Sequence, residues 1–124
     1  MIPLRIFLFI GLLFPFARFA HAADQQSVLR WGASELVGST IELVSDTHIE
    51  WMHFNADGSL PITIGTKGGW VAGPIFTWHI DSNGVLVIID NRGHEFKAMR
   101  KVSIDKNSVI VDVDGSPVTY KRLE

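Results

Sequence analysis

The sequence predicts an all-β protein: an eight-stranded antiparallel up-and-down meander that closes into a small barrel, after one short N-terminal helical turn. Three observations predict it. Apolar and polar residues alternate with a period of two over most of the chain after residue 38. Dipeptides that accept a positive φ separate these stretches, among them Asp57-Gly58, Asn83-Gly84 and Asp114-Gly115. Nearly every connection has hairpin length, so consecutive strands should be neighbours and the last can pair with the first.

The N-terminal segment predicts export. Met1 to Arg5 carries one positive charge, residues 6–16 form an apolar run, and Ala20-His21-Ala22 has the small-x-small pattern of a signal peptidase site. These three parts are typical of a secretory signal peptide over residues 1–22, cleaved after Ala22 or Ala23. We therefore expect a periplasmic or secreted bacterial protein in which residues 23–124 form a single β-barrel domain.

The charge of the mature chain disfavours two classes of partner. Removal of the signal peptide takes Arg5 and Arg18 from the 11 basic residues and leaves 9 against 13 acidic ones, a net charge of −4. Nucleic acids and anionic membranes bind basic faces, so we expect no nucleic-acid partner and no stable membrane insertion after cleavage. The sequence has no cysteine, so the small core must be held by packing alone.

The elements follow in order from the turn chemistry. Residues 34–38, with the sequence SELVG, indicate one helical turn that glycine ends. Residues 65–69 form a glycine-rich connection, expected to be a mobile hairpin loop at the barrel mouth. Strands are expected at residues 39–45, 48–54, 59–64, 71–80, 85–90, 94–104, 108–113 and 116–122.

Alternation along each strand then assigns the inner and outer faces. One side of the sixth strand should carry Phe96, Ala98, Val102 and Ile104, with Arg100 as an exception. The opposite side should carry Glu95, Lys97, Lys101 and Ser103. Each large side chain buried inside contributes about 1.5–3 kcal/mol. The expected interior consists of Phe54, Phe76, Trp78, Ile80, Leu86, Ile88, Phe96 and Ile104.

The segment HIEWMHFNADG, residues 48–58, has the residue types of a metal site. His48 and His53 are five residues apart, which places them on opposite faces of a strand, so we interpret the segment as a strand that runs into a turn. His53 and His79 on one outer face remain the best candidates for a weak two-histidine site. Catalytic zinc usually has three protein ligands, and the chain lacks both cysteine and a Gly-x-Ser-x-Gly motif. We expect no metal, no cofactor and no enzymatic activity.

Four residues are candidates for contact with a ligand or partner. Glu50 shares its parity with Met52 and should point inward near one end of the barrel. Trp51 should point outward, on an exposed apolar stripe that would suit a protein partner. Lys67 and Trp70 lie in or beside the glycine-rich loop, where they could contact a ligand.

Taken in order, several segments resemble the small bacterial lipocalin-like, or calycin-like, β-barrel proteins. The resemblance rests on the turn ELVGST at 35–40, the strand end FNADGS at 54–59, the hairpin from Thr77 to Ile88 with its inward Trp78, and the terminal TYKR. The family has Gly-x-Trp at its first strand, whereas this chain has threonine at position 40. The resemblance implies the fold and a non-enzymatic role in binding a small apolar ligand. The alternative is an exported protein-binding module of the inhibitor or immunity type.

Overall fold

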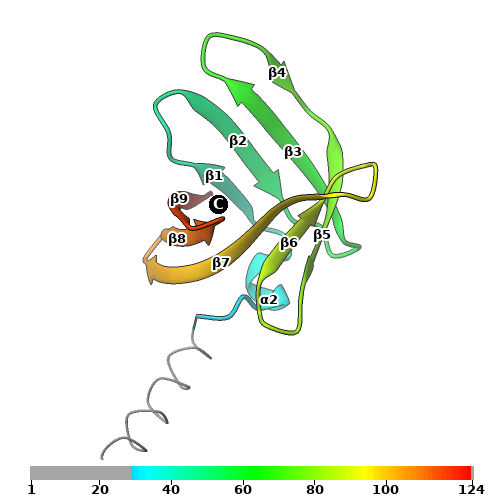
Figure 1. Ribbon diagram of the computed structural model, residues 1–124, viewed down its shortest axis with the longest axis vertical. Coiled ribbons are helices and arrows are strands. Elements are labelled where there is room, and N and C mark those ends of the chain that lie inside the picture. The colour runs from blue at the N-terminus through cyan, green and yellow to red at the C-terminus, as the bar shows by residue number, and fades with distance from the viewer. Residues whose placement is uncertain (1–28, 124) are drawn as a thin grey trace, which may run out of the picture.

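A computed structural model describes residues 29–123 of the chain (Figure 1). The expected signal peptide lies outside the described residues. Within them, the structure is a closed antiparallel β-barrel preceded by one short helix, as the sequence predicts. The elements are α2 (Ala33–Leu36), β1 (Thr40–Leu43), β2 (His48–His53), β3 (Ser59–Thr66), β4 (Val71–Ala72), β5 (Ile75–Ile80), β6 (Leu86–Ile89), β7 (Glu95–Asp105), β8 (Ser108–Val113) and β9 (Ser116–Leu123).

Eight of the strands form the barrel wall. Each pairs with the next along the chain, from β1 to β2, β3, β5, β6, β7, β8 and β9, and β9 pairs back with β1. The expected strand at 71–80 is divided into β4 and β5 because Gly73-Pro74 interrupts it, and proline has no N–H for the ladder. The two-residue β4 pairs with β3 alone, at Ile64 and Gly65.

The connections divide the barrel into two ends. The turns β1–β2, β3–β4, β6–β7 and β8–β9 gather at one end, which we call the mouth. The opposite end, which we call the floor, has the turns β2–β3, β5–β6 and β7–β8 together with α2. Gly58 and Gly84 have φ values of 90° and 78°, which confirms that both turns need a backbone conformation that favours glycine.

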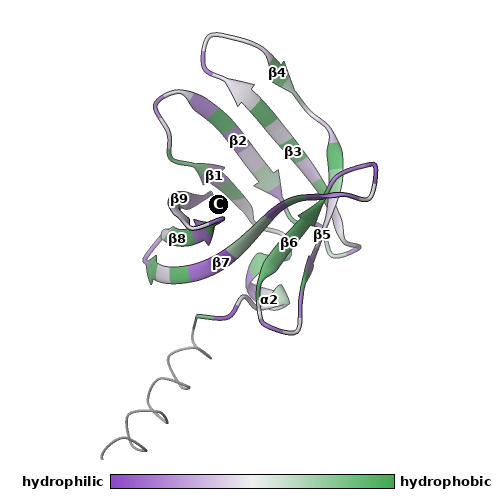
Figure 2. Ribbon diagram, viewed as in Figure 1, coloured by the Kyte–Doolittle hydropathy of each residue, from purple (hydrophilic) through white to green (hydrophobic). Residues whose placement is uncertain are grey.

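The core fills the part of the barrel nearer the floor. Phe54, Leu86 and Ile88 are buried as predicted, as is Phe76, and Trp78 and Ile80 pack against them as partly buried residues. Figure 2 shows alternating hydrophobic and hydrophilic bands along β2, hydrophobic and near-neutral bands along β3, and an almost uniformly hydrophobic β6. The fully buried large side chains are Leu36, Ile41, Met52, Phe54, Leu60, Leu86, Ile88, Met99, Val111 and Tyr120.

The predicted faces of β7 are wrong between residues 96 and 102, because two β-bulges interrupt its alternation, whereas Glu95 and Ser103 are exposed as predicted. Ile88 pairs with Lys97 and Ile89 with Glu95, so Phe96 is an extra residue; Val102 is likewise skipped opposite β8. Each extra residue switches the side chains that follow it to the opposite face of the strand, so the second bulge undoes the switch made by the first.

Between the two bulges, the inward positions are Lys97, Met99 and Lys101. Ala98 and Arg100 face outward, so Arg100 is no exception to an apolar inner face. Phe96 and Ile104, both expected inside, are 37% and 53% exposed at the two ends of the barrel.

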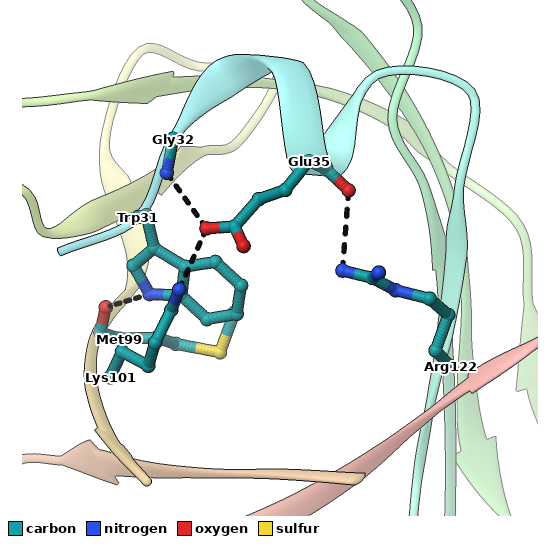
Figure 3. Close-up of polar contacts among 6 residues, drawn as sticks. All are labelled: Trp31, Gly32, Glu35, Met99, Lys101 and Arg122. Atoms are coloured by element: carbon teal, nitrogen blue, oxygen red, sulfur yellow. Dashed lines mark hydrogen bonds and ion pairs between the residues drawn. The ribbon is translucent and has the colours of Figure 1, made fainter. Parts of the chain in front are cut away.

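The segment around α2 closes the floor (Figure 3). The Trp31 side chain is buried, and its indole N–H donates to the carbonyl oxygen of Met99 over 2.9 Å. Glu35 accepts from the backbone N–H of Gly32 at 2.8 Å and from Lys101 Nζ at 2.7 Å. Among residues 29–123, no helix has the length and apolar character needed to cross a membrane.

Candidate ligand-binding mouth

A cavity of about 400 Å³ lies at the mouth. Its walls come from β1, β2, β3, β7 and β9 and from the loop that precedes β4, so it sits above the solid part of the core. Most of its surface is apolar. The apolar walls consist of Leu43, Ile49, Ile64, Trp70, Phe96 and Val118, and the polar side chains are those of His48, Glu50, Thr66 and Lys97.

Glu50 and Lys97 line this cavity and form a polar cluster with Tyr120, which is fully buried and does not line it. Lys97 Nζ lies 2.6 Å from Glu50 Oε1 and 3.2 Å from the Tyr120 hydroxyl oxygen. The Tyr120 hydroxyl donates to the other carboxylate oxygen, Oε2. Both oxygens of Glu50 therefore have a donor, which is what allows a carboxylate to lie inside an apolar barrel.

Tyr120 is held in its neutral form. Burial raises the pKa of its hydroxyl far above the ordinary value of 10.0, and the adjacent negative charge of Glu50 and the hydrogen bond to it act in the same direction. The neutral hydroxyl keeps the proton that it donates to Glu50 and still accepts from Lys97. The polar cluster is thus a fixed arrangement with one positive and one negative charge.

The loop that carries Trp70 is a tight hairpin whose backbone hydrogen-bonds both within the loop and to the turn between β1 and β2. The N–H of Thr66 donates to the carbonyl of Trp70 over 3.0 Å, and the N–H of Lys67 donates to the carbonyl of Thr47 over 2.9 Å. A Cβ atom at Gly65 would lie 2.2 Å from the Trp70 carbonyl oxygen. Glycine at position 65 therefore lets the chain carrying Trp70 approach β3 closely.

The structure brings together two of the four predicted contact residues. Glu50 points inward, as expected, and Trp70 lines the same cavity while 63% exposed. Trp51 lies on the outer surface, 46% exposed, and its indole N–H donates to Glu42 over 2.7 Å. Lys67 lies at the rim, where its ammonium donates to the Ser45 carbonyl over 2.6 Å.

The histidines of the HIEWMHFNADG segment belong to a strand, β2, as interpreted from their spacing. His53 Nδ1 is 2.7 Å from the Thr40 hydroxyl. His79 lies on β5, which is separated from β2 by β3. Within residues 29–123, no group of three or more His, Cys, Asp or Glu side chains is placed to hold a metal ion.

Sequence reasoning missed Lys97 and Tyr120. The period-two pattern places Lys97 on the outer face because it does not contain the bulge at Phe96. Tyr120 shares its parity with Val118, which was the available signal for an inward position on β9.

Comparison of the chain with protein-family models, with curated proteins and with solved structures finds no match.

Proposed function

We propose that this chain is an exported, non-enzymatic binding protein that takes up a small, largely apolar ligand in the mouth of its barrel. The mouth cavity carries the proposal, because its volume of about 400 Å³ lies within the range of about 300–1,000 Å³ seen for ligand pockets. The solid core beneath it limits the depth of the cup. A short or compact molecule fits this shape better than a long chain.

The polar cluster suggests how such a ligand is oriented. The side chain of Lys97 is 18% exposed and that of Glu50 is 8% exposed, so the ammonium is the more accessible of the two charges. An ammonium has three donors, and Lys97 uses two of them on Glu50 and Tyr120. A ligand with one polar group should therefore place a hydrogen-bond acceptor toward Lys97 and its apolar body against Trp70 and Phe96.

Fluorescence titration with N-phenylnaphthylamine, a neutral apolar probe, tests this proposal. We expect saturable enhancement of the probe's fluorescence that a competing apolar molecule reverses. Trp70→Ala should weaken probe binding about tenfold, because a tryptophan ring that becomes covered by a bound ligand is commonly worth about 1–2 kcal/mol. Trp51→Ala is the matched control and should leave binding unchanged, since Trp51 lies outside the barrel. Unsaturable enhancement, or equal loss in both variants, would contradict ligand binding at the mouth.

A second candidate function, binding of a protein partner, is favoured by the outer surface of the barrel. Trp51, Val71 and Ile75 share the outward parity of neighbouring strands and are 46%, 55% and 64% exposed. We call these three residues the outer apolar face. Exposed apolar surface beside a short edge strand is typical of a docking surface.

Affinity capture from periplasmic extract separates the two functions. The second function predicts one partner that the native protein retains and that Val71→Lys loses, while probe binding at the mouth is retained. Recovery of the native protein without any partner, or recovery of the same proteins with native protein and with Val71→Lys, would count against the second function.

A further inference from the structure

We propose that the floor of the barrel holds a second binding site, for a small oxyanion, in a cavity of about 70 Å³ beside Trp31 and Lys101. This floor cavity lies at the opposite end from the mouth, so the inference does not depend on the proposed function. Its lining combines side chains from the segment around α2 with others from β1, β7, β8 and β9. Residues distant in the sequence therefore converge on one small space.

The charges around the floor cavity favour an anion. Three cationic side chains line it, those of Lys101, Lys106 and Arg122, against one acid, Glu35. This local excess of two positive charges stands out on a chain whose formal net charge is −2. Glu35 is already engaged by Lys101 over 2.7 Å, which leaves the other two cations without a carboxylate partner among residues 29–123.

The contacts of the cations leave donors available to a bound group. Arg122 donates one hydrogen bond, over 3.2 Å, to the backbone carbonyl of Glu35, and a guanidinium has five donors in all. Figure 3 shows Lys101 and Arg122 approaching Glu35 from opposite sides. Lys101 is 3% exposed, with its ammonium 4.8 Å from the centre of the Trp31 ring. A buried lysine and an arginine fork on one lining supply the positive charge and the free N–H donors that an oxyanion requires.

The size of the floor cavity sets the class of ligand. A volume of about 70 Å³ has room for a few water molecules or for one inorganic oxyanion, but not for a large organic acid. Trp31, Ile41 and Val109 supply apolar lining, which lowers the local polarity and strengthens the attraction between opposite charges. The ligand that fits the floor cavity is therefore a small free oxyanion, of the size of phosphate or of a short carboxylate.

Isothermal titration calorimetry with sodium phosphate, with sodium acetate and with sodium chloride, at one ionic strength, tests this inference. We expect saturable binding of phosphate or acetate with one site per chain, and no saturable heat with chloride. Comparing phosphate with acetate distinguishes a tetrahedral from a planar oxyanion. No saturable heat with either oxyanion would overturn the inference.

Two variants and a control assign the binding to the floor cavity. Arg122→Gln should weaken oxyanion binding about tenfold, the effect expected for one lost charged hydrogen bond. Lys106→Gly should also weaken it, and this change suits the fold because Lys106 has a φ of 50°, a conformation that favours glycine.

Lys121→Gln is the matched control. Lys121 is next to Arg122 on β9 but pairs with Glu42 at 3.3 Å, so its loss changes the net charge equally without touching the floor cavity. The affinity of Lys121→Gln for the oxyanion should stay within about twofold of the native value, since the removed charge is exposed and screened. Equal weakening in Lys121→Gln and Arg122→Gln, or none in Arg122→Gln, would overturn the assignment.

Discussion

Replacement of Lys97 by methionine tests whether the polar cluster at the mouth is as buried and as specifically paired as the geometry shows. The change removes the ammonium 2.6 Å from Glu50 and leaves the carboxylate with Tyr120 as its side-chain donor. Breaking a buried ion pair by removing one partner costs about 3–5 kcal/mol. We expect the lower end, about 3 kcal/mol, because Tyr120 still donates to Glu50.

The loss is large compared with the stability of a domain of this size. Small domains unfold with free energies of about 5–15 kcal/mol, so Lys97→Met should lose a substantial fraction of that value. Its Tm should fall by about 12–24 °C, taking 4–8 °C for each kcal/mol in a domain of this length. Urea unfolding at neutral pH, followed by tryptophan fluorescence, measures the free energy directly.

Two further variants make this prediction refutable. Lys121→Met breaks the exposed ion pair with Glu42 and should cost no more than about 1 kcal/mol. The triple variant Glu50→Leu, Lys97→Met and Tyr120→Phe removes both charges together with the hydroxyl that bonds to them. It leaves no buried polar group of the cluster unpaired, so it should be more stable than Lys97→Met by about 1 kcal/mol or more. Equal costs for Lys97→Met and Lys121→Met, or a triple variant less stable than Lys97→Met, would show that Glu50 is solvated and that the reasoning is wrong.

Three other perturbations follow from the same structure. Burial raises the pKa of the Tyr120 hydroxyl, so the stabilisation that its neutral form provides is complete below pH 10.0 and is lost as the pH rises above that value. Above pH 10.0, the free energy of unfolding should therefore fall less steeply in Tyr120→Phe than in the native protein, as measured by urea unfolding between pH 9 and 11. Gly65→Ala forces a Cβ against the Trp70 carbonyl, and should cost about 1–3 kcal/mol in urea and weaken probe binding. Trp31→Phe removes the donor to Met99 and should cost about 1–3 kcal/mol by thermal unfolding, whereas an unchanged Tm would mean that the floor is not sealed by this contact.

Turn chemistry and alternation were enough to predict the order of the strands and the closure of the barrel. Asp57-Gly58 and Asn83-Gly84 mark hairpins because few other dipeptides accept the backbone conformation that such turns need. The inward placement of Glu50 followed from its parity with Met52 and Phe54. These features are local, so a single sequence contains them.

The charged partners inside the barrel could not be predicted in the same way. Glu50 meets Lys97 across 47 positions and Tyr120 across 70, and Glu35 meets Lys101 across 66. A lysine on an inward face is unfavourable until its acid is known, so a pattern-based assignment places it outside. The long-range pairing that makes these positions acceptable exists only once the barrel has closed.

The two bulges of β7 connect the two candidate sites. Between them, Lys97, Met99 and Lys101 face inward in succession, so one short segment reaches from the mouth through the core to the floor. A one-residue slip would turn all three outward and bring Ala98 and Arg100 inside, leaving both glutamates without their lysines. The extra residues Phe96 and Val102 therefore determine where positive charge enters the barrel. The two β-bulges that make the period-two pattern fail along β7 also place Lys97 in the wall of the mouth cavity and Lys101 in that of the floor cavity.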